Sequence, residues 1–297
     1  MLDTFSAPGR FWRGNLHAHS SQSDGLLAPD DVCTRYRLAG YDFISVTDHF
    51  LPAYGYPLTD TRPYRAKGFT TLLGAEMHAP RTSRDEQWHL LAIGLPEGFP
   101  ATGPAETGIE LARRCKEAGA FVAIAHPHWY QLRLEDALTI DAAHAVEVYN
   151  HTGAINCDRG DGLVMYDALL SEGRRLSAIA VDDGHWMTPD FFGGWVMVKA
   201  EADGPEQLLE ALKAGRFYAS QGPEIHDVRL TGDTLEISCS PAETVILVGP
   251  VSMNSREHGR GLRHASFSVE KYRGAWCRAV VVDATGKRAW SNPLWLE

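Results

Sequence analysis

Short apolar runs alternate with longer amphipathic segments through the first two thirds of the chain. The apolar runs lie at 43–49, 70–78, 89–94, 121–127, 145–150, 176–183 and 194–200. Each run is almost continuously apolar, which is typical of strands that are buried on both faces of a parallel sheet. We therefore predict a β-strand at each of these positions.

Four amphipathic segments between these runs have the boundary residues of helices. They cover 29–40, 104–119, 160–173 and 204–215. The first begins with Pro29 and two acidic residues and ends with Gly40, which suits the two ends of a helix. The alternation of strands and helices predicts an α/β fold with a parallel sheet, and about seven such units favour closure into a barrel.

The pattern changes after the segment 215–223. From there on, short runs rich in β-branched and aromatic residues are separated by turn residues. This spacing indicates a small antiparallel β-sandwich. We predict a main α/β domain at 1–222 and a small all-β domain at 223–297.

Potential metal ligands stand at the ends of the predicted strands. His17 and His19 end the stretch NLHAH, and residues two apart in an extended segment face the same side. The other strand ends carry Asp48, His49, Glu76, His78, His126, His128, Asp182, Asp183 and His185. In a parallel α/β barrel these ends share one face, where active sites are built. A lone HxH is weak, but its recurrence with four further strand ends predicts a metal cluster.

His89 begins its predicted strand instead of ending it. Only the polar segment 79–88 separates this strand from the one that carries Glu76. If the two strands form an antiparallel hairpin, the start of the second lies beside the end of the first. We therefore expect His89 at the same face as the other candidate ligands.

A set of His, Asp and Glu residues without thiolates suits zinc, manganese or iron. Nine candidate ligands exceed the needs of one ion, so two or three divalent metal ions that share carboxylates are expected. Such clusters activate water as hydroxide and stabilise the attacking and leaving oxygens of a displacement at phosphorus.

The formal charge of -10 belongs entirely to the part before Gly222. That part has 19 basic and 29 acidic residues, whereas the rest has nine of each. An acidic main domain argues against a nucleic-acid partner, because phosphate-backbone binding depends on Lys and Arg. A small-molecule substrate is expected instead, and the sequence does not decide the oligomeric state.

The five cysteines are widely spaced and form no CxxC motif, which indicates free thiols in a reducing compartment. The N-terminal stretch has no apolar signal region, and no segment approaches the length of a membrane span. We expect a cytoplasmic protein without a membrane partner.

The stretches NLHAHSSQSDG, FISVTDH, LLGAEMH, IAHP and VDDGH resemble, in this order, the motifs of the PHP (polymerase and histidinol phosphatase) superfamily of metal-dependent phosphoesterases. The shared pattern covers roughly residues 14–222. VEVYN, GRFYASQGP and the terminal WSNPLWL are similar to the CehA/McbA-like branch, which carries a small C-terminal β-domain.

The resemblance implies a distorted seven-stranded β/α (TIM-like) barrel with a di- or trinuclear site. It assigns His17, His19, Glu76 and Asp183 to one ion, with Glu76 bridging to a second ion held by His89 and His126. Asp24, His49 and His185 match the ligands of a third ion. Many members of the superfamily have a histidine at the position of Asp24, which bears on the metal preference and occupancy of that third position.

Several residues are candidates for roles around the metals. Asp48 is expected to orient a ligand histidine through a hydrogen bond. Arg81, Arg84 and Arg159 are candidates for binding an anionic substrate, because a guanidinium group suits phosphate, and His128 is a candidate for lining the mouth of the site.

These residues predict a metal-dependent hydrolase that cleaves a small-molecule phosphate ester. The first alternative is hydrolysis of a carboxylic or carbamate ester, as in the CehA/McbA-like branch, and the second is a non-catalytic metal-binding module. Ser20, Ser21 and Ser23 lie beside His19, but no GxSxG motif surrounds them, which argues against a serine hydrolase.

Overall fold

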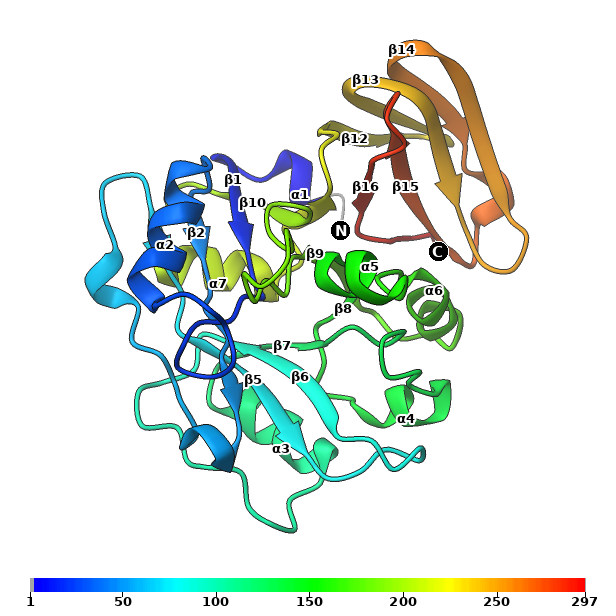
Figure 1. The fold of residues 1–297 in the computed structure, drawn as a ribbon. Helices are drawn as coiled ribbons and strands as arrows, with labels where there is room; N and C mark the ends of the chain where they lie inside the picture. Colours follow the sequence, from blue (N-terminus) through cyan, green and yellow to red (C-terminus); the bar gives the residue numbers. More distant parts are fainter. Residues whose placement is uncertain (1–2, 297) are drawn as a thin grey trace.

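The computed structural model describes residues 3–296 and shows a mixed α/β fold with two main sheets and short helices (Figure 1). The helices are α1 (Asp3–Ser6), α2 (Pro29–Leu38), α3 (Gly108–Glu117), α4 (Leu134–Thr139), α5 (His151–Cys157), α6 (Leu163–Ser171) and α7 (Pro205–Lys213), with 3-10 turns η1 (Pro52–Tyr54), η2 (Arg62–Tyr64) and η3 (Glu270–Tyr272). The four predicted helices correspond to α2, α3, α6 and α7. The α3 helix begins with a capping box between Thr107 and Glu110, which satisfies backbone groups at its first turn.

The first of the two sheets has six strands in the order β3-β5-β6-β7-β8-β9. These strands are β3 (His49–Phe50), β5 (Gly74–Ala79), β6 (Trp88–Ile93), β7 (Phe121–Ile124), β8 (Ala145–Asn150) and β9 (Ser177–Val181). Neighbours are parallel except at β6, which is antiparallel to both β5 and β7. In the β5–β6 hairpin His78 lies opposite His89. The predicted hairpin is therefore confirmed, and it returns His89 to the edge where β5 ends.

The second sheet follows the order β12-β13-β15-β16-β11-β10-β1-β2-β4, with β14 and β17 attached to β13 and β15. Its strands are β1 (Arg10–Asn15), β2 (Phe43–Ile44), β4 (Thr70–Thr71), β10 (Trp195–Ala200), β11 (Phe217–Ser220), β12 (Ile225–Thr231), β13 (Thr234–Val248), β14 (Asn254–Ser268), β15 (Trp276–Val282), β16 (Arg288–Ser291) and β17 (Leu294–Trp295). The predicted strands at 43–49 and 70–78 are thus each divided, β2 and β4 belonging to this sheet and β3 and β5 to the other.

Backbone hydrogen bonds join the two sheets where the divided strands pass between them. The Thr47 amide donates to the Ala18 carbonyl, and the Glu76 amide donates to the Thr47 carbonyl. At the other side, the Asp183 amide donates to the His17 carbonyl. These bonds place the segments that follow β1, β2 and β9 beside the end of β5.

The strands after residue 222 pack around an apolar core of their own, which also receives Tyr218 of β11. They form the unit at the upper right of Figure 1. This unit continues the second sheet, because β16 pairs antiparallel with β11 and places Ser291 opposite Tyr218. A bidentate contact of 2.9 and 2.8 Å from buried Arg278 to Asp167 of α6 ties the unit to the helical side of the main part.

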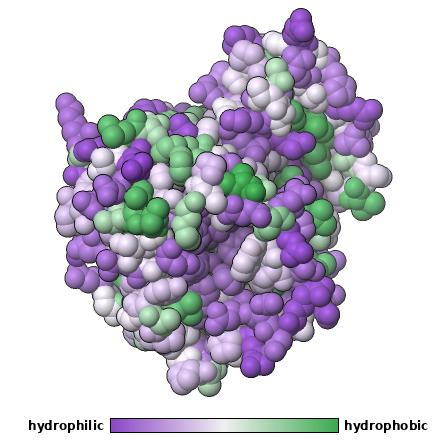
Figure 2. Space-filling model, viewed as in Figure 1, coloured by the Kyte–Doolittle hydropathy of each residue, from purple (hydrophilic) through white to green (hydrophobic). Residues whose placement is uncertain are grey.

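Apolar side chains fill the space between the sheets and the helices, and all residues of β7 and β9 are buried, as predicted for strands covered on both faces. On the face shown in Figure 2, hydrophilic residues prevail and apolar residues form small separate patches. None of the helices in residues 3–296 has the length and apolar character needed to cross a bilayer. The five cysteines are free thiols, as predicted.

Candidate metal centre

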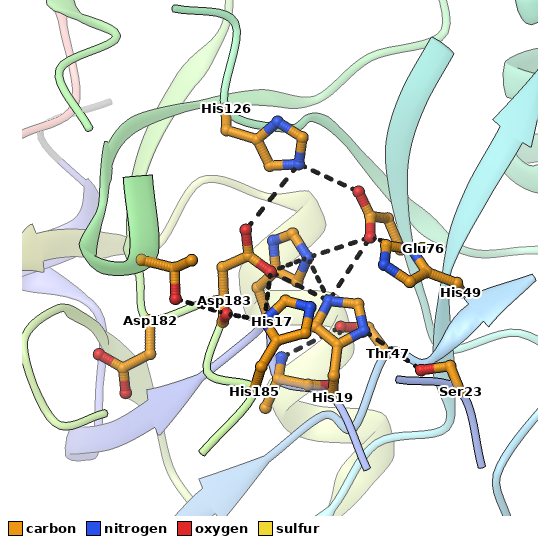
Figure 3. Close-up of polar contacts among 12 residues, drawn as sticks. His17, His19, Ser23, Thr47, His49, Glu76, His126, Asp182, Asp183 and His185 are labelled. Carbon is orange, nitrogen blue, oxygen red and sulfur yellow. Dashed lines mark hydrogen bonds and ion pairs between the residues drawn. The ribbon is translucent and has the colours of Figure 1, made fainter. Parts of the chain in front are cut away.

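The first group of converging side chains comes from the segment after β1, from β5 and from the loop after β9 (Figure 3). The Nε2 atoms of His17 and His19 lie 3.2 Å apart. Asp183 Oδ1 lies 3.1 Å from His17 Nε2 and 3.0 Å from His19 Nε2. Glu76 Oε2 lies 3.5 Å from both nitrogens. Four potential ligand atoms therefore face one point.

A second group surrounds the other oxygen of Glu76. Glu76 Oε1 lies 2.7 Å from His89 Nδ1 and 3.0 Å from His126 Nε2. The ligand atoms of these three residues are close enough to hold one ion. The two oxygens of Glu76 therefore face two different groups of histidines.

A third group lies on the more exposed side. Asp24 Oδ2 is 3.4 Å from His49 Nε2, and Asp24 Oδ1 is 3.5 Å from His185 Nε2. His19 joins this group through the proximity of its ring. All nine residues predicted as ligands thus lie in one continuous cluster, within which several overlapping groups could each hold an ion.

The cluster fits divalent cations better than it fits a network of hydrogen bonds. Within residues 3–296, buried Glu76 Oε2 receives no hydrogen bond of acceptable geometry, and the same is true of the buried His126 Nδ1 atom. Imidazole nitrogens of His49, His17 and His19 nevertheless lie 2.7 to 3.5 Å from Glu76 Oε2. Converging nitrogen and carboxylate donors without thiolates suit zinc, manganese or iron.

Comparison with known structures addresses the fold that carries this cluster. A two-domain protein from Bacteroides vulgatus, described as containing a predicted PHP-like metal-dependent phosphoesterase, matches with a TM-score of 0.57 at 17% sequence identity over 97% of each chain. The chain has a PHP-like fold. No protein-family model and no curated protein matches the sequence.

Two further solved structures match over part of the chain. A candidate metal-dependent phosphoesterase from Bifidobacterium adolescentis is 18% identical, with a TM-score of 0.44 over 59% of this chain and 89% of its own. An amidohydrolase from Chromobacterium violaceum with bound sulfate and no metal is 15% identical, with a TM-score of 0.45 over 58% of this chain and 87% of its own. At these TM-scores neither neighbour informs the fold or function of this chain.

Carboxylates hold protons on two histidines of the third group when no cation is bound. Burial opposes the protonation of His49, but Glu76 and Asp24 outweigh it and raise its pKa to about 10. Burial likewise opposes the protonation of His185, but Asp24 and Asp183 outweigh it and raise the pKa of His185 to about 9. A metal ligand must be the neutral imidazole, so an ion has to displace these protons.

We therefore expect the affinity for an ion held by the third group to increase with pH. Below pH 9 both His49 and His185 are protonated in the metal-free protein and compete with the ion, whereas above about pH 10 both are neutral and the dependence ends. Zinc or manganese titrations by calorimetry from pH 6 to 9, in two buffers of different ionisation enthalpy, measure the affinity and the protons released. An affinity that is constant over this range, without proton release, would contradict the expectation.

His19 differs from these two residues. Burial, followed by the nearby His185 and His49, lowers its pKa to about 4. Its imidazole is therefore neutral at pH 7 and is available as a ligand without loss of a proton. His17 has the opposite balance, since Asp183 and Glu147 overcome the effect of burial and raise its pKa well above the usual value.

Glu147 is a functional candidate that the sequence analysis missed. Its Oε1 lies 2.6 Å from His17 Nδ1, and its Oε2 accepts hydrogen bonds of 2.7 Å from the His126 amide and 3.0 Å from Asn150 Nδ2. A carboxylate that accepts the remote N–H of a ligand histidine fixes the ring and its tautomer. The available signal was a single acidic residue inside the apolar run AVEVYN.

Two of the candidate ligands, Asp183 after β9 and His126 after β7, have a strained backbone conformation. Asp183 has φ of 58°, a region that costs energy for residues other than glycine. Its carbonyl accepts 2.7 Å hydrogen bonds from Thr152 Oγ1 and His185 Nδ1, which help to hold this geometry. His126 also has a positive φ, of 21°.

Two aspartates next to ligands serve the loops. Asp48 accepts hydrogen bonds from Ser20, Ser23 and Thr59 at 2.5 to 2.8 Å, which differs from the predicted bond to a ligand histidine. Asp48 therefore fixes the turn that follows His17 and His19, because its carboxylate is already occupied by hydrogen bonds from Ser20 and Ser23 in that turn. Asp182 turns away from the histidines (Figure 3) and accepts bonds from Tyr36 and from the amides of residues 192–194.

His78 is buried beside the centre and not at its mouth. Its Nε2 lies 2.9 Å from His49 Nδ1 and 3.9 Å from Glu76 Oε2, while its Nδ1 faces the Trp88 carbonyl at 3.2 Å. Together with His49 and Glu76 it forms a further group that is able to hold a metal ion.

The candidate substrate residues lie around the face and outside the cluster. Exposed Arg81 forms an ion pair with Asp85. Arg84 and His128 line the same open groove, of about 540 Å³, beside α6. Arg159 donates to the Trp129 carbonyl at 3.3 Å. The contacts of the described residues thus place no guanidinium group in direct contact with the nine ligands.

Proposed function

We propose that this protein is a metal-dependent hydrolase that cleaves a phosphate ester of a small molecule. The observation that carries the proposal is the position of Glu76, a buried carboxylate whose two oxygens face two separate sets of histidines. Bound divalent cations supply a lowered pKa for water and compensation of negative charge on the phosphoryl oxygens. In the hydrolysis, the oxygen of water bonds to phosphorus, the bond to the alcohol oxygen breaks, and the alcohol leaves with a proton.

The residues of this chain would divide the work as follows. His17, His19, Glu76 and Asp183 would hold one ion, His89 and His126 a second beside Glu76, and Asp24, His49 and His185 a third. Glu147 would orient His17 through its Nδ1 atom. The exposure of Asp24, His49 and His185 would let substrate approach from the third group, while the first group stays excluded from water.

The remaining predictions belong to this proposal. We propose that the two sheets, with the bonds that join them, form the distorted seven-stranded β/α barrel. The strands after residue 222 would form the β-sandwich, with the domain boundary between residues 222 and 223. The CehA/McbA-like branch, a cytoplasmic location, and the absence of nucleic-acid and membrane partners rest on the sequence. Arg81, Arg84, Arg159 and His128 remain the candidates for contacts with an anionic substrate, and two of them, Arg84 and His128, share one groove.

A second candidate function has an observation in its favour. The cluster is surrounded by carboxylates and histidines, and the recorded contacts of residues 3–296 bring no Arg or Lys against it. A neutral carboxylic or carbamate ester would need no such cation, whereas a phosphate dianion gains from one. The same metal centre would then hydrolyse an acyl ester.

One experiment separates these functions. Metal-stripped protein is reloaded with manganese or zinc and offered p-nitrophenyl phosphate, bis-p-nitrophenyl phosphate and p-nitrophenyl acetate, with His19→Ala as the control. We expect turnover of a phosphoester that is lost in the control, and the preferred one assigns a mono- or diesterase. Turnover of the acetate alone favours the ester hydrolase, and turnover of none of the three by fully loaded protein contradicts the proposal and favours a non-catalytic metal-binding module.

A further inference from the structure

The ligands of the candidate centre differ in their access to solvent. The side chains of His17, His19 and Glu76 are completely buried. Those of Asp24, His49, His89 and His185 are between 14% and 36% exposed. The mouth of the centre is therefore on the side of these four residues.

Two aromatic rings stand at this mouth, one on each side. Tyr54 stacks on His49 with ring centroids 6.3 Å apart, and Trp129 contacts the ring of His89 at 5.5 Å. His49 and His89 are neighbours, with centroids 6.5 Å apart. Tyr54 and Trp129 thus flank the pair of histidines that approaches Glu76 from the solvent side. Tyr54 and Trp129 are 38% and 46% exposed as residues, so each presents free surface beside the ligands.

Two aliphatic side chains complete this apolar rim, which we define as Leu26, Tyr54, Trp129 and Met187. Leu26 follows Asp24 by two positions, and its amide is bonded to the His185 carbonyl at 2.9 Å. Met187 follows His185 by two positions. Leu26 and Met187 are each 65% exposed. Each partly exposed ligand at the mouth therefore has a large exposed apolar residue either two positions along its own segment or against its ring.

Exposed apolar side chains that are scattered singly need no special explanation. Two of them against ligand rings and two more within two positions of exposed ligands are different, because such residues can bury apolar surface of a molecule whose charged end reaches the metals. We propose that the substrate is an ester whose alcohol part is apolar and flat, and that the rim, above all Tyr54 and Trp129, binds this part. The inference rests on the proposed function, because it takes the phosphoryl end to lie at the metal centre.

The chemistry of the rim favours an aromatic alcohol over a sugar or a short polyol. Aromatic side chains bind flat apolar groups by stacking or edge contacts, and their burial adds to the affinity in proportion to the apolar area removed from water. The rim as defined contributes only two polar groups, the Tyr54 hydroxyl and the Trp129 indole N–H, and no charged group. It therefore offers little to a polyhydroxylated group.

Binding of phosphonates tests this inference without depending on turnover. Phenylphosphonate and methylphosphonate have the same charged end, and their C–P bonds resist hydrolysis. We expect calorimetry with zinc-loaded wild-type protein to show roughly tenfold tighter binding of phenylphosphonate. A Tyr54→Ala/Trp129→Ala double variant should lose this preference and keep its affinity for methylphosphonate, and Trp129→Phe alone should keep most of it.

The control is Val251→Ala, which removes a fully exposed apolar side chain from the turn between β13 and β14 and should change neither affinity. Because Tyr54 and Trp129 contact ligand rings, circular dichroism and metal analysis of each variant check that the fold and the metal centre are retained. If the double variant loses metal, Leu26→Ser/Met187→Ser replaces it, and this variant should also weaken the preference for phenylphosphonate. Equal affinities in wild type, or a preference that survives loss of the rim, overturn the inference. Failure of both phosphonates to bind overturns the proposed function instead.

Discussion

Replacement of Glu76 by glutamine is expected to reduce hydrolysis by roughly a thousandfold or more and to remove at least one bound ion per chain. The carboxylate faces both histidines of the His17/His19 pair with one oxygen and both histidines of the His89/His126 pair with the other. Glutamine retains the shape of the side chain but replaces one of the two ligand oxygens with an NH2 group, which does not bind a cation. The substitution also removes the negative charge that would attract the ions on both sides of residue 76.

Metal analysis after gel filtration, together with turnover of the best substrate from the panel above, measures this effect. Glu236→Gln is the matched control, because Glu236 is exposed on β13, in the unit after residue 222. Its metal content and activity should equal those of wild type. Full metal content and activity in Glu76→Gln would exclude the bridging role, and with it the principal support for a shared metal cluster.

Replacement by asparagine of the two neighbouring aspartates after β9 is expected to affect different properties, stability for Asp182 and metal binding for Asp183. Asp182 is completely buried and accepts hydrogen bonds of 2.7 Å from Tyr36 and of 2.7 to 2.9 Å from the amides of residues 192–194. An asparagine there turns an NH2 group toward donors that have no other partner. We expect Asp182→Asn to lower the free energy of unfolding by about 3 kcal/mol and the Tm by roughly 6 to 12 °C.

Asp183→Asn is the matched control for that variant. Asp183 faces His17 and His19, so its replacement should reduce metal content and turnover while the Tm of the metal-free protein changes much less. Thermal unfolding of both metal-free variants, followed by circular dichroism, separates the two roles. A larger loss of Tm in Asp183→Asn than in Asp182→Asn would show that the assignment is reversed.

The strand ends made most of the candidate centre predictable. His17, His19 and Glu76 lie on one face of extended segments, and parallel strands bring such segments to a common edge. His89 needed the further step of a hairpin, which the short polar segment before it made available and β5 and β6 confirm. Strand ends predict the site residues because sheet topology, and not side-chain detail, decides which strand ends meet.

Other features depend on tertiary contacts that no local pattern records. Glu147 occupies a buried strand position at which the sequence pattern alone would predict an apolar residue. The reason for a carboxylate there is its contact with His17, which is distant in the sequence. Asp48 reaches the hydroxyls of Ser20 and Thr59 because of how two loops fold against each other. Arg81 and Arg159 lie on loops, whose course the apolar pattern does not fix.

The sheet order also has a consequence for when the centre is able to form. Strand β1 lies between β10 and β2, so the histidines that follow the first strand meet Asp183 across 164 positions of sequence. A chain still being synthesised therefore exposes the HxH pair long before its partners leave the ribosome. Binding of the proposed ions would then follow the folding of roughly the first two hundred residues, because contacts this distant in sequence form late. The cell would then load a finished protein, whose rigid groups are better able than a nascent segment to discriminate between competing ions.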